Sequence, residues 1–265
     1  MIFIDSGHIG FTKEQVSTIT LDEYTPVMRN ELMNSLILKD KSGIITDPHQ
    51  LKHIHETLKL KVGDIIKCTV LNQGLTKGRV EAVEKTSCHL KLESLSPGET
   101  QWFDLVIGLS RPQTSKKILE HATTFGARKI QFFKAALSEK SYLDSKIFED
   151  RAYEEFLIAG LSQSAIYTDL PQFKLDIYNP ANQYQNAPQK FILDLKAEKS
   201  FSDLHLDFAK PITLAIGPER GFIDEDIEKF HAAGFTSIKI SSSVLRVEHA
   251  VYSAISQLEL LRARF

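Results

Sequence analysis

The sequence is poor in the residues and runs that would take it outside the ordinary globular class. It has only two cysteines, Cys68 and Cys88, which lie in separate strand-like segments without the spacing of metal ligands. They are interpreted as reduced core residues of a cytoplasmic protein. No apolar run approaches the length of a membrane span, and the N-terminus lacks the basic and then apolar pattern of a secretory signal.

A strong net charge is also lacking. The formal net charge is −2, which does not by itself favour a nucleic-acid-binding protein. The charge is unevenly distributed, because residues 33–91 carry ten Lys or Arg against six Asp or Glu. A basic module of this kind is consistent with a surface that faces RNA. With 265 residues, 42% of them hydrophobic and 25% charged, the chain can form one large or two modest globular domains.

Residues 33–94 are rich in short strand patterns, with a short helix at about residues 49–58. The strands are predicted at residues 35–38, 65–71, 78–85 and 87–92. Several short strands closed by Gly and Asn turns predict a small β-barrel. Residues 1–32 are polar and weakly periodic, and their pattern assigns them no role. They are expected to pack loosely or to lie along the domain surface.

The predicted helix contains three histidines, His49, His53 and His55, of which the first two are one helical turn apart. A metal site is one interpretation. However, no cysteine or carboxylate completes a set of ligands at convincing spacing. Side chains at the surface or facing RNA are therefore favoured, and no metal is predicted.

Beyond a linker at residues 94–100, strand and helix patterns alternate to the end of the chain. The strands are predicted at residues 103–109, 129–133, 191–195, 212–216 and 236–240. The helices are predicted at residues 116–125, at 150–163, from 224 onward, and at 247–262. This alternation predicts an α/β domain with a mostly parallel sheet covered by helices. A segment rich in Pro, Asn and Gln at residues 178–189 is predicted to be a mobile loop.

The stretch that follows the apolar strand at residues 212–216 has the composition of a ligand loop. Gly217 and Gly221 bracket a tight turn where backbone can approach a ligand, and Pro218 stiffens it. Asp224 is a predicted N-cap, and more acidic residues follow in the first helical turn. Because phosphate cradles use a bare helix N-terminus, a ligand here is expected to be neutral or cationic.

A second loop, at residues 241–246, follows the strand at residues 236–240 and precedes the last helix. Both loops are expected to leave the same end of neighbouring parallel strands, which is typical of a crevice for a small ligand. The same pattern is also typical of an ordinary strand–loop–helix connection that binds nothing.

Two motifs in these loops resemble the paired signature of one family. The first is Gly217-Pro218-Glu219-Arg220-Gly221-Phe222, and the second is Val244-Leu245-Arg246-Val247-Glu248-His249-Ala250. Their order and spacing resemble those of the SPOUT-class (trefoil-knotted) methyltransferases of small-subunit ribosomal RNA, of the RsmE type, which methylate N3 of a uridine. Residues 53–64 are similar to part of that family's PUA-like RNA-binding domain.

The resemblance implies a domain organisation, a cofactor and partners. The implied parts are the extension at residues 1–32, a PUA-like RNA-binding β-barrel domain at residues 33–94, and a SPOUT methyltransferase domain with a C-terminal trefoil knot at residues 101–265. The implied methyl donor is S-adenosylmethionine. The implied partners are ribosomal RNA within the small subunit and a second copy of the chain, with the last helix in the homodimer interface.

The resemblance also implies roles for individual residues. The cofactor-binding residues would be Leu193, Asp194, Leu195, Ile216, Gly217, Pro218, Glu219, Gly221, Ile240, Ser241, Val244 and Leu245. The RNA-binding residues would be Lys59, Lys61, Arg111, Lys116, Lys140, Ser141, Tyr142 and Arg220. Arg246 would stabilise negative charge on the uridine oxygens, while Glu219 or Glu248 would accept the N3 proton or orient Arg246. A plain helix-start carboxylate is the alternative for Glu248.

The chain departs from the family's usual motifs at four positions. Arg220 and Ser241 stand where Gly is usual, Ser243 where Arg is usual, and His249 where Thr is usual. Ser241 places a side chain where backbone normally meets the cofactor. A non-catalytic RNA-binding paralogue with altered cofactor loops is therefore the alternative function. A dinucleotide-binding oxidoreductase is a third interpretation, but it lacks a G-x-G-x-x-G motif after a strand.

Overall fold

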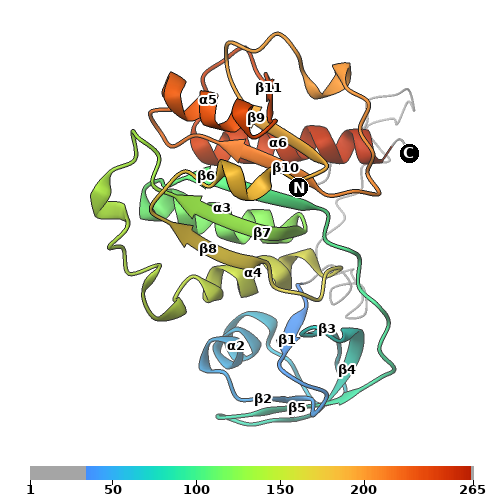
Figure 1. Cartoon of the computed structure of the whole chain (residues 1–265). Coiled ribbons are helices and arrows are strands. Elements are labelled where there is room, and N and C mark those ends of the chain that lie inside the picture. Colours follow the sequence, from blue (N-terminus) through green and yellow to red (C-terminus); the bar gives the residue numbers. More distant parts are fainter. Residues whose placement is uncertain (1–33, 264–265) are drawn as a thin grey trace, which may run out of the picture.

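The computed structural model describes residues 34–263, so the extension predicted at residues 1–32 lies outside the described residues. Two sheets organise the described chain (Figure 1). The smaller sheet, between residues 36 and 92, has five strands in the order β1-β3-β4-β5-β2. The larger sheet, between residues 103 and 238, has six strands in the order β11-β9-β10-β6-β7-β8.

The strands of the small sheet enclose a core of their own. They are β1 (Leu36–Leu38), β2 (Ile44–Ile45), β3 (Ile65–Val70), β4 (Gly74–Val83) and β5 (Cys88–Leu92). The helix α2 (Pro48–Lys52) and a π-helical turn, η2 (His53–Leu58), add Leu51 and Ile54 to this core. The prediction of a small β-barrel is confirmed as a nearly closed sheet. No sequence pattern predicts β2, because it has only two residues.

The large sheet is parallel throughout. Its strands are β6 (Phe103–Gly108), β7 (Ala127–Phe133), β8 (Gln172–Asp176), β9 (Gln189–Leu193), β10 (Ile212–Ile216) and β11 (Thr236–Ile238). Its helices are α3 (Pro112–Thr124), α4 (Glu154–Ser164), α5 (Asp224–Ala232) and α6 (Val247–Arg262). The predicted α/β architecture is therefore confirmed, and the trefoil knot implied by the resemblance stays a prediction.

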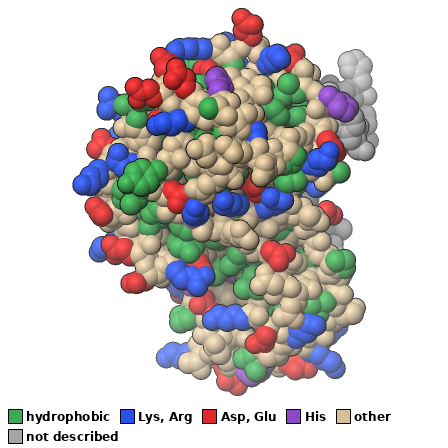
Figure 2. Space-filling view, viewed as in Figure 1, with side chains coloured by type: hydrophobic (Ala, Val, Ile, Leu, Met, Phe, Trp, Pro, Cys, Tyr) green, Lys and Arg blue, Asp and Glu red, His purple; other side chains and the backbone are tan. Residues whose placement is uncertain are grey.

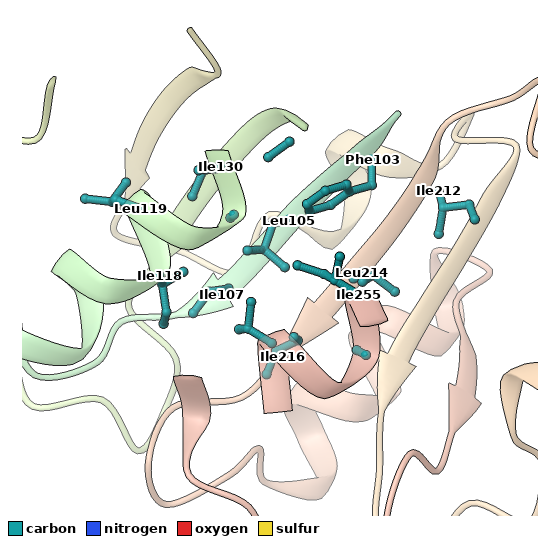
Figure 3. Packing of buried hydrophobic residues seen from close by; sticks show 14 of the residues in the cluster. Phe103, Leu105, Ile107, Ile118, Leu119, Ile130, Ile212, Leu214, Ile216 and Ile255 are labelled. Atoms are coloured by element: carbon teal, nitrogen blue, oxygen red, sulfur yellow. The ribbon is translucent and has the colours of Figure 1, made fainter. Parts of the chain in front are cut away.

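Helices cover both faces of this sheet. The central strands β6 and β10 are buried along their whole length. Leu105 and Ile107 of β6 join a cluster with α3 and α6, whereas Val106 joins a second cluster with Phe230 of α5, because successive side chains of a strand point to opposite faces. Figure 3 shows the first cluster, in which side chains of β6, β10, α3 and α6 converge. Ligand sites of this domain are thus expected at the ends of its strands.

The structure corrects several predicted boundaries. The helix α3 begins at Pro112 rather than at residue 116, because proline suits the first helical position. The edge strand β8 is not predicted, since its side chains are half-buried or exposed without a clear apolar pattern. The segment at residues 178–189, predicted to be mobile, contains the 3-10 turn η5 (Ala181–Tyr184), in which Ala181 and Tyr184 are buried.

Candidate active site

A cavity of about 270 Å³ lies at the carboxyl ends of three strands of the parallel sheet. Its walls come from the ends of β9, β10 and β11, from the loops that follow them, and from the first turn of α6. The sequence predicts two loops on neighbouring strands. That prediction is wrong in one respect, because β9 lies between β10 and β11. Three loops therefore meet at the cavity, and the one after β9 is central.

Every residue implied as cofactor-binding lines this cavity. The lining includes Leu193, Asp194, Leu195, Ile216, Gly217, Pro218, Glu219, Gly221, Ile240, Ser241, Val244 and Leu245. The sequence did not assign Phe222, Ile238, Ser243, Val247 and Ala250 to the site, although they also line it, and Arg220, expected to contact RNA, lies there too. All of these residues except Ile238 belong to the two quoted motifs or adjoin them. Their place in the site could therefore have been predicted from the motifs.

The loop after β10 is folded tightly on itself and on β6. Gly221 has a φ of +74° and donates its N–H to the carbonyl of Pro218 at 2.8 Å. A Cβ placed on Gly108, at the end of β6, would lie 2.4 Å from Cδ of Pro218. The loop can therefore reach its position only because residue 108 is glycine. Sequence reasoning missed Gly108, although a glycine that ends an apolar strand is a signal of close backbone approach.

The loop after β11 accommodates the unusual Ser241. The hydroxyl oxygen of Ser241 accepts the backbone N–H of Ser243 at 3.0 Å, so this side chain is engaged by its own loop. Val244 and Leu195, on the rim of the cavity, are 83% and 50% exposed. Exposed apolar side chains gathered at a cavity mouth indicate a surface that binds a ligand or a partner.

The loop after β9 places a fixed carboxylate in the cavity wall. Oδ1 of Asp194 accepts the backbone N–H of Lys196 at 2.8 Å, and Oδ2 accepts the hydroxyl of Ser237 at 3.3 Å. The same hydroxyl lies 2.8 Å from Nε2 of His231. Asp194 is thereby held from two elements, and its charge is available for the hydroxyl or ammonium groups of a ligand.

The residues implied as catalytic occupy different positions around the cavity. Glu219 is exposed and lines the wall, and its Oε1 accepts the backbone N–H of Arg111 at 2.7 Å. Arg246 is exposed and forms the N-cap of α6 next to the cavity. Glu248 is only 6% exposed and lies 3.8 Å from Nζ of Lys117. Of the three residues implied as catalytic, Glu219 lies in the cavity wall, while Arg246 and Glu248 adjoin the cavity.

The helix that follows the first motif does not begin as predicted. Ile223, not Asp224, is the N-cap of α5, and no side chain caps it. Asp224 instead pairs with Lys196 at 3.2 Å on the surface. The acidic first turn is nevertheless present, and it opposes an anionic ligand at this helix end.

The residues implied in RNA binding are not gathered on one patch. Lys59 and Lys61 are exposed on the small domain, whereas Lys140 and Ser141 are exposed in the 3-10 turn η3 (Lys140–Tyr142) after β7. Tyr142, Lys116 and Arg111 also have structural contacts. Tyr142 packs on the core, Nζ of Lys116 lies 5.0 Å from the Phe156 ring centre, and Arg111 is the N-cap of α3. In the view of Figure 2, Lys and Arg alternate with Asp and Glu rather than forming one basic face.

The described residues form neither a metal site nor a membrane-spanning helix. Between residues 34 and 263, no three His, Cys, Asp or Glu side chains gather as metal ligands would. In the same part of the chain, no helix combines the length and hydrophobicity needed to cross a bilayer.

Cys68 and Cys88 are free and buried, and burial raises the pKa of the Cys68 thiol to about 12. Their interpretation as thiols of the core is confirmed.

The chain matches one family model and is similar in sequence to known proteins over most of its length. The family model for the RNA methyltransferase domain matches residues 98–259. The chain is 32% identical, over 81% of its length and 91% of the other, to ribosomal RNA small subunit methyltransferase E 1 from Borreliella burgdorferi. It is 29% identical, over 76% of its length and 79% of the other, to ribosomal RNA small subunit methyltransferase E from Treponema pallidum.

A solved structure has the same fold. It is a ribosomal RNA small subunit methyltransferase E from Neisseria gonorrhoeae bound to S-adenosyl methionine. The TM-score is 0.70 and the identity 16%, and the match covers 86% of this chain and 98% of that one. The agreement extends over both sheets, so the arrangement of a small barrel beside a parallel sheet is shared.

Proposed function

This chain belongs to the RNA methyltransferase family, and we propose that it transfers a methyl group from S-adenosylmethionine to N3 of a uridine in small-subunit ribosomal RNA. The observation that carries the proposal is the three-loop cavity, whose wall contains all twelve residues implied as cofactor-binding. The relatives' names support the RNA substrate. The choice of uridine N3 is implied by the RsmE-type family, whose signature the two motifs resemble.

The chemistry of the cavity wall suits S-adenosylmethionine. Leu193, Ile216 and Leu245 offer apolar surface for a purine ring, and the fixed carboxylate of Asp194 suits hydroxyl or ammonium groups. The acidic first turn of α5 disfavours a phosphate but tolerates a cation. When bound, S-adenosylmethionine supplies a methyl carbon carried by a positively charged sulfur.

The side chains of this protein then hold the uridine and accept the proton that leaves its N3. We assign Glu219 as the acceptor of the N3 proton, because it lies in the cavity wall whereas Glu248 does not. Arg246, with five N–H donors in a fixed fork, stabilises the charge that develops on the uridine oxygens. Glu248, in the first turn of α6, is left to position Arg246. Most of the catalysis consists of holding the two reacting atoms in line.

The homodimer implied by the resemblance is also part of the proposal. The apolar stripe on α6, which includes Val251, Ala254, Ile255 and Leu258, is buried within the chain's own core. An interface on α6 must therefore use its other side, where Leu260 is 59% exposed.

We propose the cytoplasm as the compartment, because small ribosomal subunits are the substrate.

Transfer of radiolabelled methyl from S-adenosylmethionine to small ribosomal subunits that lack this modification tests the proposal. We expect label at N3 of a single uridine. Absence of both transfer and cofactor binding would contradict it and favour a non-catalytic RNA-binding paralogue. In that event Ser241→Gly, which restores the family's usual residue, should recover cofactor binding, whereas Ser202→Gly at an exposed position elsewhere should not.

A further inference from the structure

The segment after the edge strand β8 presents two apolar side chains to solvent. Ile177 is 62% exposed and Tyr178 is 82% exposed. Within residues 34–263, every other Phe, Tyr and Trp is buried or half-buried. Packing therefore accounts for the other aromatic side chains of the described chain, but it does not account for Tyr178.

Tyr178 lies at the same edge of the sheet as the candidate active site. Parallel strands end at one edge, so the loops after β10, β6, β7 and β8 follow one another along it. In that order they carry Glu219 and Arg220, then Arg111, then Lys140 and Ser141, and finally Tyr178. Since β8 is three strands from β10, Tyr178 lies roughly 14 Å along the sheet from the cavity. A strand of RNA with its target uridine in the cavity would extend along this edge.

The backbone on both sides of Tyr178 is held in place. The carboxylate of Asp176 accepts hydrogen bonds from Gln131, Gln183 and Lys174, and its carbonyl accepts the N–H of Lys134 at 3.0 Å. Three residues after Asp176, Asn179 accepts the N–H of Ala181 through Oδ1. The exposed pair Ile177 and Tyr178 thus projects from a fixed base, which lowers the entropy lost when a ligand binds.

A buried carboxylate links this base to the active-site loops. Asp226 of α5 is 4% exposed, and its oxygens accept Nδ2 of Asn179 at 3.3 Å and the backbone N–H of Ala136 at 3.2 Å. The helix α5 follows the loop that carries Glu219, and Ala136 precedes the loop that carries Lys140. Asp226 therefore joins three loops of the same edge, including the one that presents Tyr178.

The charge of this edge favours stacking over attraction to phosphates. Residues 134–151, which follow β7, carry four Lys or Arg and four Asp or Glu. Net attraction to a polyanion is consequently small, and affinity has to come from contacts with bases. We infer that Tyr178 is a stacking platform for an unpaired base of the RNA substrate, close to the methylated uridine. This inference rests on the proposed function and adds a specificity element to it.

Steady-state methyl transfer with three variants tests the inference. Tyr178→Ala is expected to raise the KM for the RNA substrate roughly tenfold while the affinity for S-adenosylmethionine stays unchanged. Tyr178→Phe keeps the ring and should behave as the wild type. Ile166→Ala removes an apolar side chain that is 45% exposed near the linker, and should have no effect on the KM for RNA.

A fluorescence titration reads stacking directly and does not depend on catalysis. The chain has one tryptophan, Trp102, which is 6% exposed, so the wild type supplies the baseline. In Tyr178→Trp, emission should be quenched by a single-stranded 12-nucleotide RNA but not by an abasic strand of the same length and charge. Equal quenching by both strands would overturn the inference.

The outcomes separate the two proposals. If the wild type transfers no methyl group, the proposed function fails. If the wild type is active and Tyr178→Ala has an unchanged KM, only the stacking platform fails. A defect that appears with assembled subunits, together with no quenching by naked RNA, would assign Tyr178 to a protein partner and would also overturn the inference.

Discussion

The parallel sheet has a cavity at each edge, and the two differ in what their polar groups do. The cavity at the amino edge is the larger, about 660 Å³ against 270 Å³ at the carboxyl edge. Its polar side chains form hydrogen bonds within the cavity wall: Arg128 contacts Asp104 through two nitrogens, at 3.0 and 3.1 Å, and Gln101 donates to the backbone carbonyl of Asp169 at 2.9 Å. The carboxyl-edge cavity has glycine loops, an apolar rim and the carboxylate residues Asp194 and Glu219 in its wall.

Volume alone therefore does not identify the site. The amino-edge cavity lies where the linker passes the sheet, and Asn72 of the small domain donates its backbone N–H to Thr168 of the large one at 3.0 Å. Its groups hold the two domains together. The carboxyl edge is where chains leave parallel strands and turn into helices, so loops there can vary without breaking the sheet. The two edges can be compared by matched substitutions.

The largest difference is expected from two glutamates. Glu219→Gln should lower kcat on the order of 1000-fold, because a proton acceptor is lost while an acceptor oxygen for Arg111 remains. Glu99→Gln, in the amino-edge cavity, should leave kcat unchanged. Single-turnover methyl transfer measures both. A normal kcat in Glu219→Gln would show that another group accepts the N3 proton.

Two glycines compare the steric demands of the edges. In Gly108→Ala the added Cβ would meet Cδ of Pro218 at 2.4 Å, and in Gly98→Ala it would meet Cγ2 of Thr168 at 2.7 Å. Gly108→Ala is expected to weaken S-adenosylmethionine binding on the order of 50-fold, because the loop after β10 must move. Gly98→Ala should reduce stability but not cofactor affinity. Isothermal titration of each variant with S-adenosylmethionine measures the affinity. An equal loss of affinity in both variants would contradict the expected difference between the two edges.

The ion pair of the amino edge should matter for stability alone. Asp104 is 7% exposed, so Arg128→Ala leaves a nearly buried carboxylate without its partner. We expect the free energy of unfolding to fall by about 2 kcal/mol, less than for a fully buried pair because Arg128 is itself partly exposed. Urea denaturation measures this change. A loss of cofactor affinity of similar size would indicate that the two edges are coupled.

The smallest effect is expected at a residue outside both cavities. The hydroxyl of Tyr252 on α6 is buried without a hydrogen-bond partner, so Tyr252→Phe should raise the free energy of unfolding by about 1 kcal/mol. Burial, with the charges of Glu248 and Glu120, raises the pKa of Tyr252 to about 12.

The sign of the pH dependence of Tyr252 follows from the unfolded chain, in which a tyrosine loses its proton near pH 10, at about its ordinary pKa. The contribution of the neutral hydroxyl is therefore fully present below about pH 10 and is lost as the pH rises toward about 12. Wild-type stability should fall more steeply over this window than that of Tyr252→Phe. Urea denaturation at pH 8 and pH 11 compares the two. Equal slopes would show that Tyr252 does not titrate differently in the folded chain.

Much of the fold could be predicted because buried parallel strands have continuous apolar runs. The strands β6 and β10 are examples. The helix α6 was also predicted, and its predicted bounds at residues 247–262 are those of the structure. The edge strand β8 escaped prediction because only part of it is buried. Asp224 was a plausible N-cap by type, but the N-cap is Ile223, one residue earlier, and Asp224 is the first residue of the helix.

The candidate site divides in the same way. Six residues of the cavity wall, Gly217, Pro218, Glu219, Gly221, Val244 and Leu245, were accessible from the two motifs, and the other six implied residues were accessible from the family resemblance. Gly108 and Asp226 were not, because their roles depend on Pro218, Ala136 and Asn179, which are distant in sequence. The roles of Arg246 and Glu248 relative to the cavity likewise required the positions of their neighbours.

The sequence by itself determined which segments form strands, which loops are glycine-rich and acidic, and which family the chain resembles. These properties depend on neighbours along the chain, through apolar periodicity and turn chemistry. Only the tertiary structure decided that β9 lies between β10 and β11, so that Asp194 enters the cavity wall, and that Tyr178 stays outside the core. Strand order and exposure result from packing between distant segments, and no local pattern encodes them.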